Sequence, residues 1–238
     1  MLTIEDLSVR HARQRDGLLR RFDLHVRVGE CCALVGPSGA GKSAVLEAIM
    51  GLRPIEAGTI RVGSSGAPEP VHDRRDGITA IWGSGAVDDG LSVRQNLSLI
   101  LQLAGVPVPP RAAMDRVLRR MELPDRLFDR AAASLSSAQR CFLWLAAACL
   151  RQTPLLLLDD PTQTWATSEA RDLTDILREL SRSGITIVLA TRDTDLACAL
   201  ADRVCVMEEG QKLTEGAPDV VFGLSARRVM RPSSGHPS

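Results

Sequence analysis

The sequence has few aromatic side chains, no tyrosine and only two lysines among its 238 residues. Its 29 basic and 29 acidic residues balance, so no net charge draws the chain to nucleic acid or to an anionic membrane. The longest apolar run, Cys141 to Leu150, lies between Arg140 and Arg151 and is too short to span a bilayer. These absences argue against nucleic-acid binding and against membrane spanning.

The six cysteines form no C-x-x-C pair and lie mostly within apolar segments. This pattern argues against a zinc site or a disulfide framework and favours small buried side chains in a reducing compartment. The first six residues lack the pattern of a signal peptide, and no segment repeats with a period of about 20–50 residues. We expect one large cytoplasmic domain, or a domain with an inserted lobe.

A glycine-rich segment follows the apolar run from Cys31 to Val35. It matches G-x-x-x-x-G-K-[ST] at every fixed position, with Gly36, Pro37, Ser38, Gly39, Ala40, Gly41, Lys42 and Ser43. Glycines let successive backbone N–H groups turn inward around an anion, and the helical pattern from Ala44 to Met50 aims its positive dipole end at them. We predict a nucleoside triphosphate site, rather than a chance glycine-rich turn, with Lys42 on the phosphates and Ser43 on Mg²⁺.

Hydrophobic patterns predict the other elements. Strands are expected at 2–9, 22–28, 58–63, 77–82, 154–159, 185–191 and 203–207, and helices at 92–104, 110–121, 136–151, 168–181 and 193–201. The first three helices follow one another without a strand, which indicates a helical insert at about 84–152. The remaining alternation of strands and helices implies a parallel sheet. Residues 223–238 are expected to form a flexible tail.

Two further segments complete a family pattern. Leu135-Ser136-Ser137-Ala138-Gln139 precedes four leucines that end in Asp159 and Asp160. In this order, with the phosphate loop, residues 1–222 resemble the ATP-binding cassette (ABC) ATPase domain. The resemblance implies an α/β fold of the P-loop NTPase class, with a RecA-like parallel sheet core, an antiparallel β subdomain and an α-helical subdomain. It implies ATP and Mg²⁺ as ligands.

The resemblance also implies roles for single residues. Asp159, with Ser43, would hold Mg²⁺. Asp160 stands where the family has the glutamate that polarises the attacking water. Ser136 and Gln139 match signature residues that contact a nucleotide bound by a second cassette. Ser134, Ser136 or Ser137 could also serve as a helix N-cap, which does not exclude that role. His11 is the nearest substitute for an aromatic residue that stacks on adenine.

Departures from the family pattern fall on the hydrolytic side. Gly83 takes the place of the water-sensing glutamine, Ala166 that of an aspartate, and Arg192 that of the switch histidine. Asp160 is shorter than glutamate by one methylene, and such a misplacement can cost about 100-fold in rate. Arg192 could contact a γ-phosphate but cannot exchange a proton as histidine does. We expect tight ATP binding with slow hydrolysis.

These features predict the ATP-binding subunit of an ABC transporter, peripheral at the cytoplasmic face of the cell membrane. Its partners would be separate transmembrane permease subunits and a second cassette. A heterodimer is favoured over a homodimer, because a homodimer would carry these departures at both sites, whereas an intact partner limits the loss of the water-activating group to one site. Two alternatives stay open: a regulatory module that acts by ATP occupancy without turnover, and a soluble ABC protein outside transport.

Overall fold

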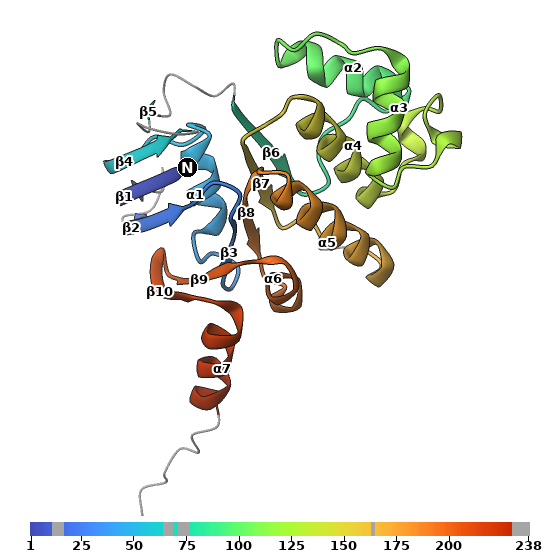
Figure 1. Ribbon diagram of the computed structural model, residues 1–238. Coiled ribbons are helices and arrows are strands. Elements are labelled where there is room, and N and C mark those ends of the chain that lie inside the picture. Colours follow the sequence, from blue (N-terminus) through green and yellow to red (C-terminus); the bar gives the residue numbers. More distant parts are fainter. Residues whose placement is uncertain (11–16, 64–68, 71–76, 163–164, 230–238) are drawn as a thin grey trace, which may run out of the picture.

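A six-stranded sheet forms the centre of the molecule. The computed structural model describes residues 1–10, 17–63, 69–70, 77–162 and 165–229 (Figure 1). In spatial order the sheet contains β10 (Gln211–Gly216), β9 (Arg203–Glu208), β3 (Cys31–Val35), β8 (Thr186–Thr191), β7 (Leu155–Asp159) and β6 (Ile78–Trp82). All neighbouring strands are parallel except the β9–β10 pair. The parallel α/β core expected from the sequence is confirmed.

The leucine run of β7 explains why this sheet is buried on both faces. Leu155 and Leu157 contribute to one hydrophobic core, and Leu156 and Leu158 contribute to the other. All four side chains have no exposed surface, because successive residues of a strand point to opposite faces of the sheet. A strand buried on both sides therefore carries an unbroken apolar run and leaves its carboxyl end as the first polar position.

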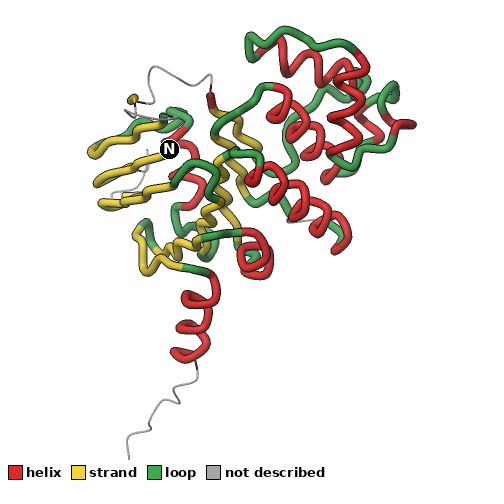
Figure 2. The backbone as a smooth tube through the Cα atoms, viewed as in Figure 1, coloured by secondary structure: helices red, strands yellow, loops and turns green. Residues whose placement is uncertain are grey.

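An antiparallel sheet covers one face of this centre. Its order is β2 (Gly17–Val26), β1 (Leu2–Arg10), β4 (Ala57–Val62) and β5 (Glu69–Pro70). Its inward side chains share a core with helix α1 (Lys42–Ile49), which lies between the two sheets (Figure 2). The predicted antiparallel β subdomain is therefore present.

The other helices lie on the opposite face and beyond it. They are α2 (Val93–Leu103), α3 (Arg111–Arg120), α4 (Ser137–Leu150), α5 (Thr167–Arg182), α6 (Thr194–Leu200) and α7 (Pro218–Val229). Two short 3₁₀ turns, Asp125–Leu127 and Ala132–Ser134, separate α3 from α4. Helices α2, α3 and α4 form a lobe on the far side of the central sheet from the antiparallel strands (Figure 1).

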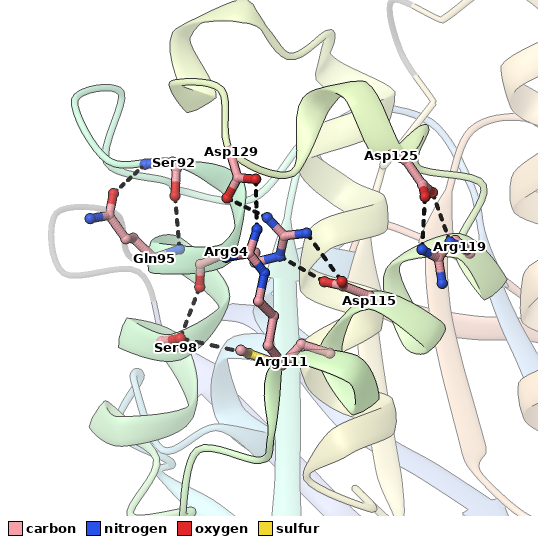
Figure 3. A network of polar contacts seen from close by, with 10 residues as sticks. Ser92, Arg94, Gln95, Ser98, Arg111, Asp115, Arg119, Asp125 and Asp129 are labelled. Atoms are coloured by element: carbon pink, nitrogen blue, oxygen red, sulfur yellow. Dashed lines mark hydrogen bonds and ion pairs between the residues drawn. The ribbon is translucent and has the colours of Figure 1, made fainter.

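A network of ion pairs joins the outer helices of this lobe. Arg94 of α2 donates two hydrogen bonds to Asp115 of α3, at 2.7 and 3.1 Å, and also pairs with Asp129 (Figure 3). The guanidinium lies over the Phe128 ring, 5.0 Å from its centre. The hydrogen bonds from Arg94 lower the pKa of Asp115. Bidentate pairs of this kind fix orientation as well as distance, so α2 and α3 are held in one relative position.

The structure differs from the sequence expectations at several elements, among them the short strand β5, which was not predicted. β2 begins at Gly17 rather than at residue 22. The turn at Glu209 and Gly210 leads into β10, which was not predicted because its side chains are mostly exposed and carry little hydrophobic signal. Both turn residues have positive φ, as a type I′ hairpin requires. Helix α7 runs to Val229, past the expected start of the tail at residue 223.

Within the described residues, no helix combines the length and the apolar character needed to cross a membrane. The cysteines Cys31, Cys32, Cys141 and Cys205 are buried, as expected, whereas Cys198 is exposed on α6.

Candidate nucleotide site

The predicted phosphate-binding loop joins the end of β3 to the start of α1. A Cβ atom at Gly36 would lie 2.2 Å from the carbonyl oxygen of Met207, so close packing against β9 excludes any side chain there. Gly41 has φ +97° and is the N-cap of α1. Glycine adopts this left-handed conformation without the steric cost that other residues incur. Packing and backbone conformation therefore both require glycine in the loop.

Lys42 is the first residue of α1 and is almost fully buried. Its ammonium group donates hydrogen bonds to the carbonyl oxygens of Gly36, at 2.7 Å, and Pro37, at 2.9 Å. Burial lowers the pKa of Lys42, while the charge of Asp160 raises it and that of Arg192 lowers it. The loop thus holds a cation against its own backbone, at the place where the motif predicts phosphate.

Asp159, at the carboxyl end of β7, lies next to Ser43, the second residue of α1. The Ser43 hydroxyl donates a hydrogen bond of 3.0 Å to Oδ1 of Asp159. Burial raises the pKa of Asp159; the Ser43 hydrogen bond opposes this effect, and the neighbouring charge of Asp160 adds to it. Hydroxyl and carboxylate oxygens are the hard ligands that Mg²⁺ prefers, so this pair fits the predicted metal site.

The raised pKa of Asp159 implies that its charge destabilises the fold. The folded chain binds this proton more tightly than the unfolded chain, so the free energy of unfolding falls as the pH rises through the folded-state pKa. Asp159→Asn keeps an oxygen for Ser43 and removes the charge. We expect its melting temperature at pH 7, without Mg²⁺, to be higher than that of the unaltered chain, because the charge that burial penalises is gone. The gain should shrink as the pH is lowered toward 4; an equal or lower melting temperature at pH 7 would contradict it.

Asp160 and Arg192 meet at the ends of β7 and β8. Nε of Arg192 donates a hydrogen bond of 3.0 Å to Oδ2 of Asp160. Asp160 has φ +47° and its backbone N–H donates to the carbonyl oxygen of Ala190 at 2.8 Å. Aspartate is among the non-glycine residues found most often in this left-handed region. The two residues predicted to flank the terminal phosphate are therefore ion-paired with each other.

Gly83 follows the last residue of β6. Its backbone N–H donates to the carbonyl oxygen of Asp159 at 3.0 Å, and its φ is +56°. A Cβ atom built on Gly83 meets nothing within 4 Å, so space does not exclude a side chain. The left-handed backbone disfavours one instead, at a cost of about 1–2 kcal/mol. At the position where the family has a glutamine, this chain thus has both a glycine and a backbone conformation that favours glycine.

A cleft of about 750 Å³ brings most of the predicted residues together. This volume is in the range of small-molecule sites. The predicted residues that line it are Ser38, Gly39, Ala40, Gly41, Lys42, Ser43, Gly83, Asp159, Asp160 and Arg192. Gly36 and Pro37 lie beneath it as the hydrogen-bond partners of Lys42.

Ser136 and Gln139, in contrast, do not line this cleft. Ser136 is the N-cap of α4; its hydroxyl accepts from the Gln139 backbone N–H, and its own N–H donates to the Gln139 side chain. The Ser136 hydroxyl also donates to Glu169 of α5 at 3.0 Å. Both residues therefore cap a helix in this chain, and their predicted contact with a second cassette stays a prediction. His11 lies outside the described residues.

Several residues that line the cleft were not predicted as site residues from the sequence. Leu18 and Trp165 are two of them, together with Glu47 and Arg53, which form an ion pair at 2.6 Å. A signal for Glu47 was available, because residues four apart on a helix share a face and Glu47 follows Ser43 by four. Leu18 adds an apolar surface to the cleft in a chain that has no tyrosine.

Comparison with known proteins agrees with this geometry. Residues 19–163 match the family model of ABC transporters. The Nod factor export ATP-binding protein I of Burkholderia orbicola (strain AU 1054) is 31% identical over 225 residues, which cover 93% of this chain and 74% of that protein. Its namesake from Paraburkholderia xenovorans (strain LB400) is 33% identical over 208 residues, or 87% and 67% of the two chains.

Solved structures share the fold. The cbiO1 protein of Clostridium perfringens, described as part of the ABC transporter complex cbiONQ, superposes with a TM-score of 0.81 at 25% identity, covering 96% of this chain and 93% of that one. The ATP-binding cassette MJ0796 superposes with a TM-score of 0.79 at 22% identity, over 92% and 99% of the two chains. The chain belongs to the ABC transporter family and is one of its ATP-binding proteins.

Proposed function

We propose that this chain binds MgATP in the cleft between α1 and the ends of β7 and β8, and that it hydrolyses ATP slowly. The observation that carries the proposal is the contrast within that cleft. The parts that bind phosphate and metal, Lys42 and the Ser43–Asp159 pair, are complete. The carboxylate expected to orient water, Asp160, is ion-paired with Arg192 instead.

In this proposal Lys42 and the loop backbone hold the phosphates. Ser43 and Asp159 hold Mg²⁺, which would neutralise phosphate charge when bound. Asp160 is short for the task of orienting water, and Gly83 supplies no side chain to help. A positioned base contributes about 10²- to 10⁴-fold to a rate, so its loss is enough to make hydrolysis slow while binding stays tight.

We propose further that the chain acts at the inner face of the cell membrane, bound to separate permease subunits and paired with a second cassette. Two relatives are named as export ATP-binding proteins, and a structural neighbour is described as part of a multisubunit transporter, which supports this assignment. A different, intact cassette is the favoured partner, because a homodimer would repeat the Asp160–Arg192 pair at both of its sites.

A regulatory role through ATP occupancy alone is the second candidate. The Asp160–Arg192 ion pair favours it, since a bound nucleotide that is not hydrolysed can still hold a conformation. In that case the chain would bind ATP and control its partner without turnover. Transport by the complex would then survive Asp160→Asn, whereas transport that depends on hydrolysis at this site would be lost.

The test is to measure MgATP binding and hydrolysis by the purified full chain. We expect saturable binding and a turnover of about 0.1 s⁻¹ or less, roughly 100-fold below a typical enzyme. Co-purification with a polytopic membrane protein would support the transporter assignment. Hydrolysis at an ordinary rate of about 10 s⁻¹ by the chain alone would contradict the proposal of an impaired site.

A further inference from the structure

The ion pair between Asp160 and Arg192 spans two neighbouring strands. β7 and β8 are parallel, and Asp159 is in register with Ala190. The residue after each strand end therefore emerges at the same edge of the sheet, and Nε of Arg192 reaches Oδ2 of Asp160 at 3.0 Å. The sheet register places the two charges together, so their contact is a product of the fold.

The side chains of Asp160 and Arg192 differ in how tightly their surroundings hold them. The Asp160 side chain is only 19% exposed, and its backbone is tied to Ala190 by a hydrogen bond of 2.8 Å. The Arg192 side chain is 49% exposed, so it can change conformation toward solvent without disturbing packed neighbours. The carboxylate is thus the fixed partner, and the guanidinium is the one that can exchange its contacts.

Both groups face the cation of the phosphate loop. Lys42, Asp160 and Arg192 line the same cleft, and the charges of Asp160 and Arg192 act on Lys42 in opposite directions. A terminal phosphate held by Lys42 would be a second anion next to Arg192. Guanidinium groups bind phosphate and carboxylate with the same fork of donors, so the two anions compete for one cation.

We propose that Arg192 is a nucleotide-sensitive latch, shared between Asp160 and the terminal phosphate of a bound nucleoside triphosphate. The proposal rests on the proposed function only for the binding of nucleotide in this cleft, and it requires no hydrolysis. A triphosphate draws the guanidinium away from Asp160 and so releases the carboxylate. A diphosphate lacks the competing group and leaves the pair closed.

The latch predicts how Asp160 affects the affinity for triphosphate relative to diphosphate. Part of the affinity for a triphosphate is used to open the ion pair, so removing Asp160 should strengthen triphosphate binding and leave diphosphate binding almost unchanged. Breaking one charge-assisted contact of this kind is expected to change affinity by about tenfold, which corresponds to about 1.4 kcal/mol. We expect Asp160→Asn to raise the preference for triphosphate over diphosphate by about tenfold.

A double-mutant cycle tests this predicted change in nucleotide preference. The preference is the ratio of dissociation constants for ADP and for the β,γ-imido analogue of ATP, measured with Mg²⁺ on the full chain and on Asp160→Asn, Arg192→Gln and the double variant. The latch predicts that Asp160→Asn raises the ratio only while Arg192 is present, so the double variant should match Arg192→Gln. Asp160→Ser removes the same carboxylate and replaces Asp160→Asn if that variant fails to fold.

Glu47→Gln is the matched control for electrostatics alone. Glu47 lines the same cleft, but its ion pair is with Arg53. Removing its charge should change the ratio by the same factor with and without Arg192. If Asp160→Asn behaves in this additive way too, or leaves the ratio unchanged, the latch is wrong while nucleotide binding stands. An unaltered chain that binds neither nucleotide would overturn both the latch and the proposed function.

Discussion

Lys42→Ala is expected to weaken ATP binding by about 100-fold or more, the largest single effect on affinity that we predict. The lysine is nearly buried at the start of α1, and its ammonium is held at the phosphate loop by two carbonyl oxygens. Two charge-assisted hydrogen bonds to phosphate, each contributing about 1.5–3 kcal/mol, amount to at least 100-fold in affinity. Titration with a fluorescent ATP analogue in the presence of Mg²⁺ measures the loss.

The chain supplies a close control for this experiment. Lys212 is its only other lysine and forms an ion pair with Glu215 at 2.6 Å on the hairpin of β9 and β10. Lys212→Ala removes the same charge and should leave ATP affinity within about twofold, since it is absent from the residues that line the cleft. Circular dichroism must confirm that both variants fold. ATP binding by folded Lys42→Ala at the unaltered affinity would refute the assignment.

Lys42→Arg separates shape from charge. The chain uses arginine for nearly all of its basic positions, yet position 42 is lysine. A guanidinium is planar and larger than an ammonium, and it cannot take the same two carbonyl contacts in a nearly buried position. We therefore expect Lys42→Arg to bind ATP at least about tenfold more weakly than the unaltered chain, although the charge is kept.

The phosphate loop and the strand before the two aspartates were predictable because each depends on local pattern. The leucines of β7 are buried on both faces of a sheet, and such a strand must be a continuous apolar run. Gly39 and Gly41 have positive φ, and close packing excludes a side chain at Gly36, so each glycine of the loop is required at its own position in the motif. These two elements could be predicted because the residues that form each of them are consecutive in the sequence.

The Asp160–Arg192 contact was beyond sequence reasoning. The two residues are 32 positions apart, and their contact depends on β8 lying next to β7 in register, which the order of elements along the chain does not determine. The same limit applies to Gly83: its identity was noted from the sequence, but its left-handed backbone and its hydrogen bond to Asp159, at the end of the neighbouring strand, were not. The strand β10 was missed because an exposed edge strand carries little hydrophobic alternation.

The combined change Asp160→Glu and Arg192→His is expected to raise ATP hydrolysis by about 100-fold. Glutamate restores the methylene that Asp160 lacks and so moves the carboxylate outward by roughly an ångström, a distance that can be worth about 100-fold in rate. Histidine removes the cation that pairs with this carboxylate and can exchange a proton near neutral pH. Steady-state phosphate release by the full chain, at saturating MgATP, measures the gain.

The single variant Asp160→Glu decides which of these causes dominates. With Arg192 in place, the longer carboxylate of Asp160→Glu remains within reach of the guanidinium, so we expect a gain of only about tenfold or less. Adding Lys42→Ala to the double variant must abolish the new activity, which excludes a contaminating ATPase. If Asp160→Glu alone reached the rate of the double variant, the side-chain length would be the whole defect and the ion pair with Arg192 would play no part in slowing hydrolysis.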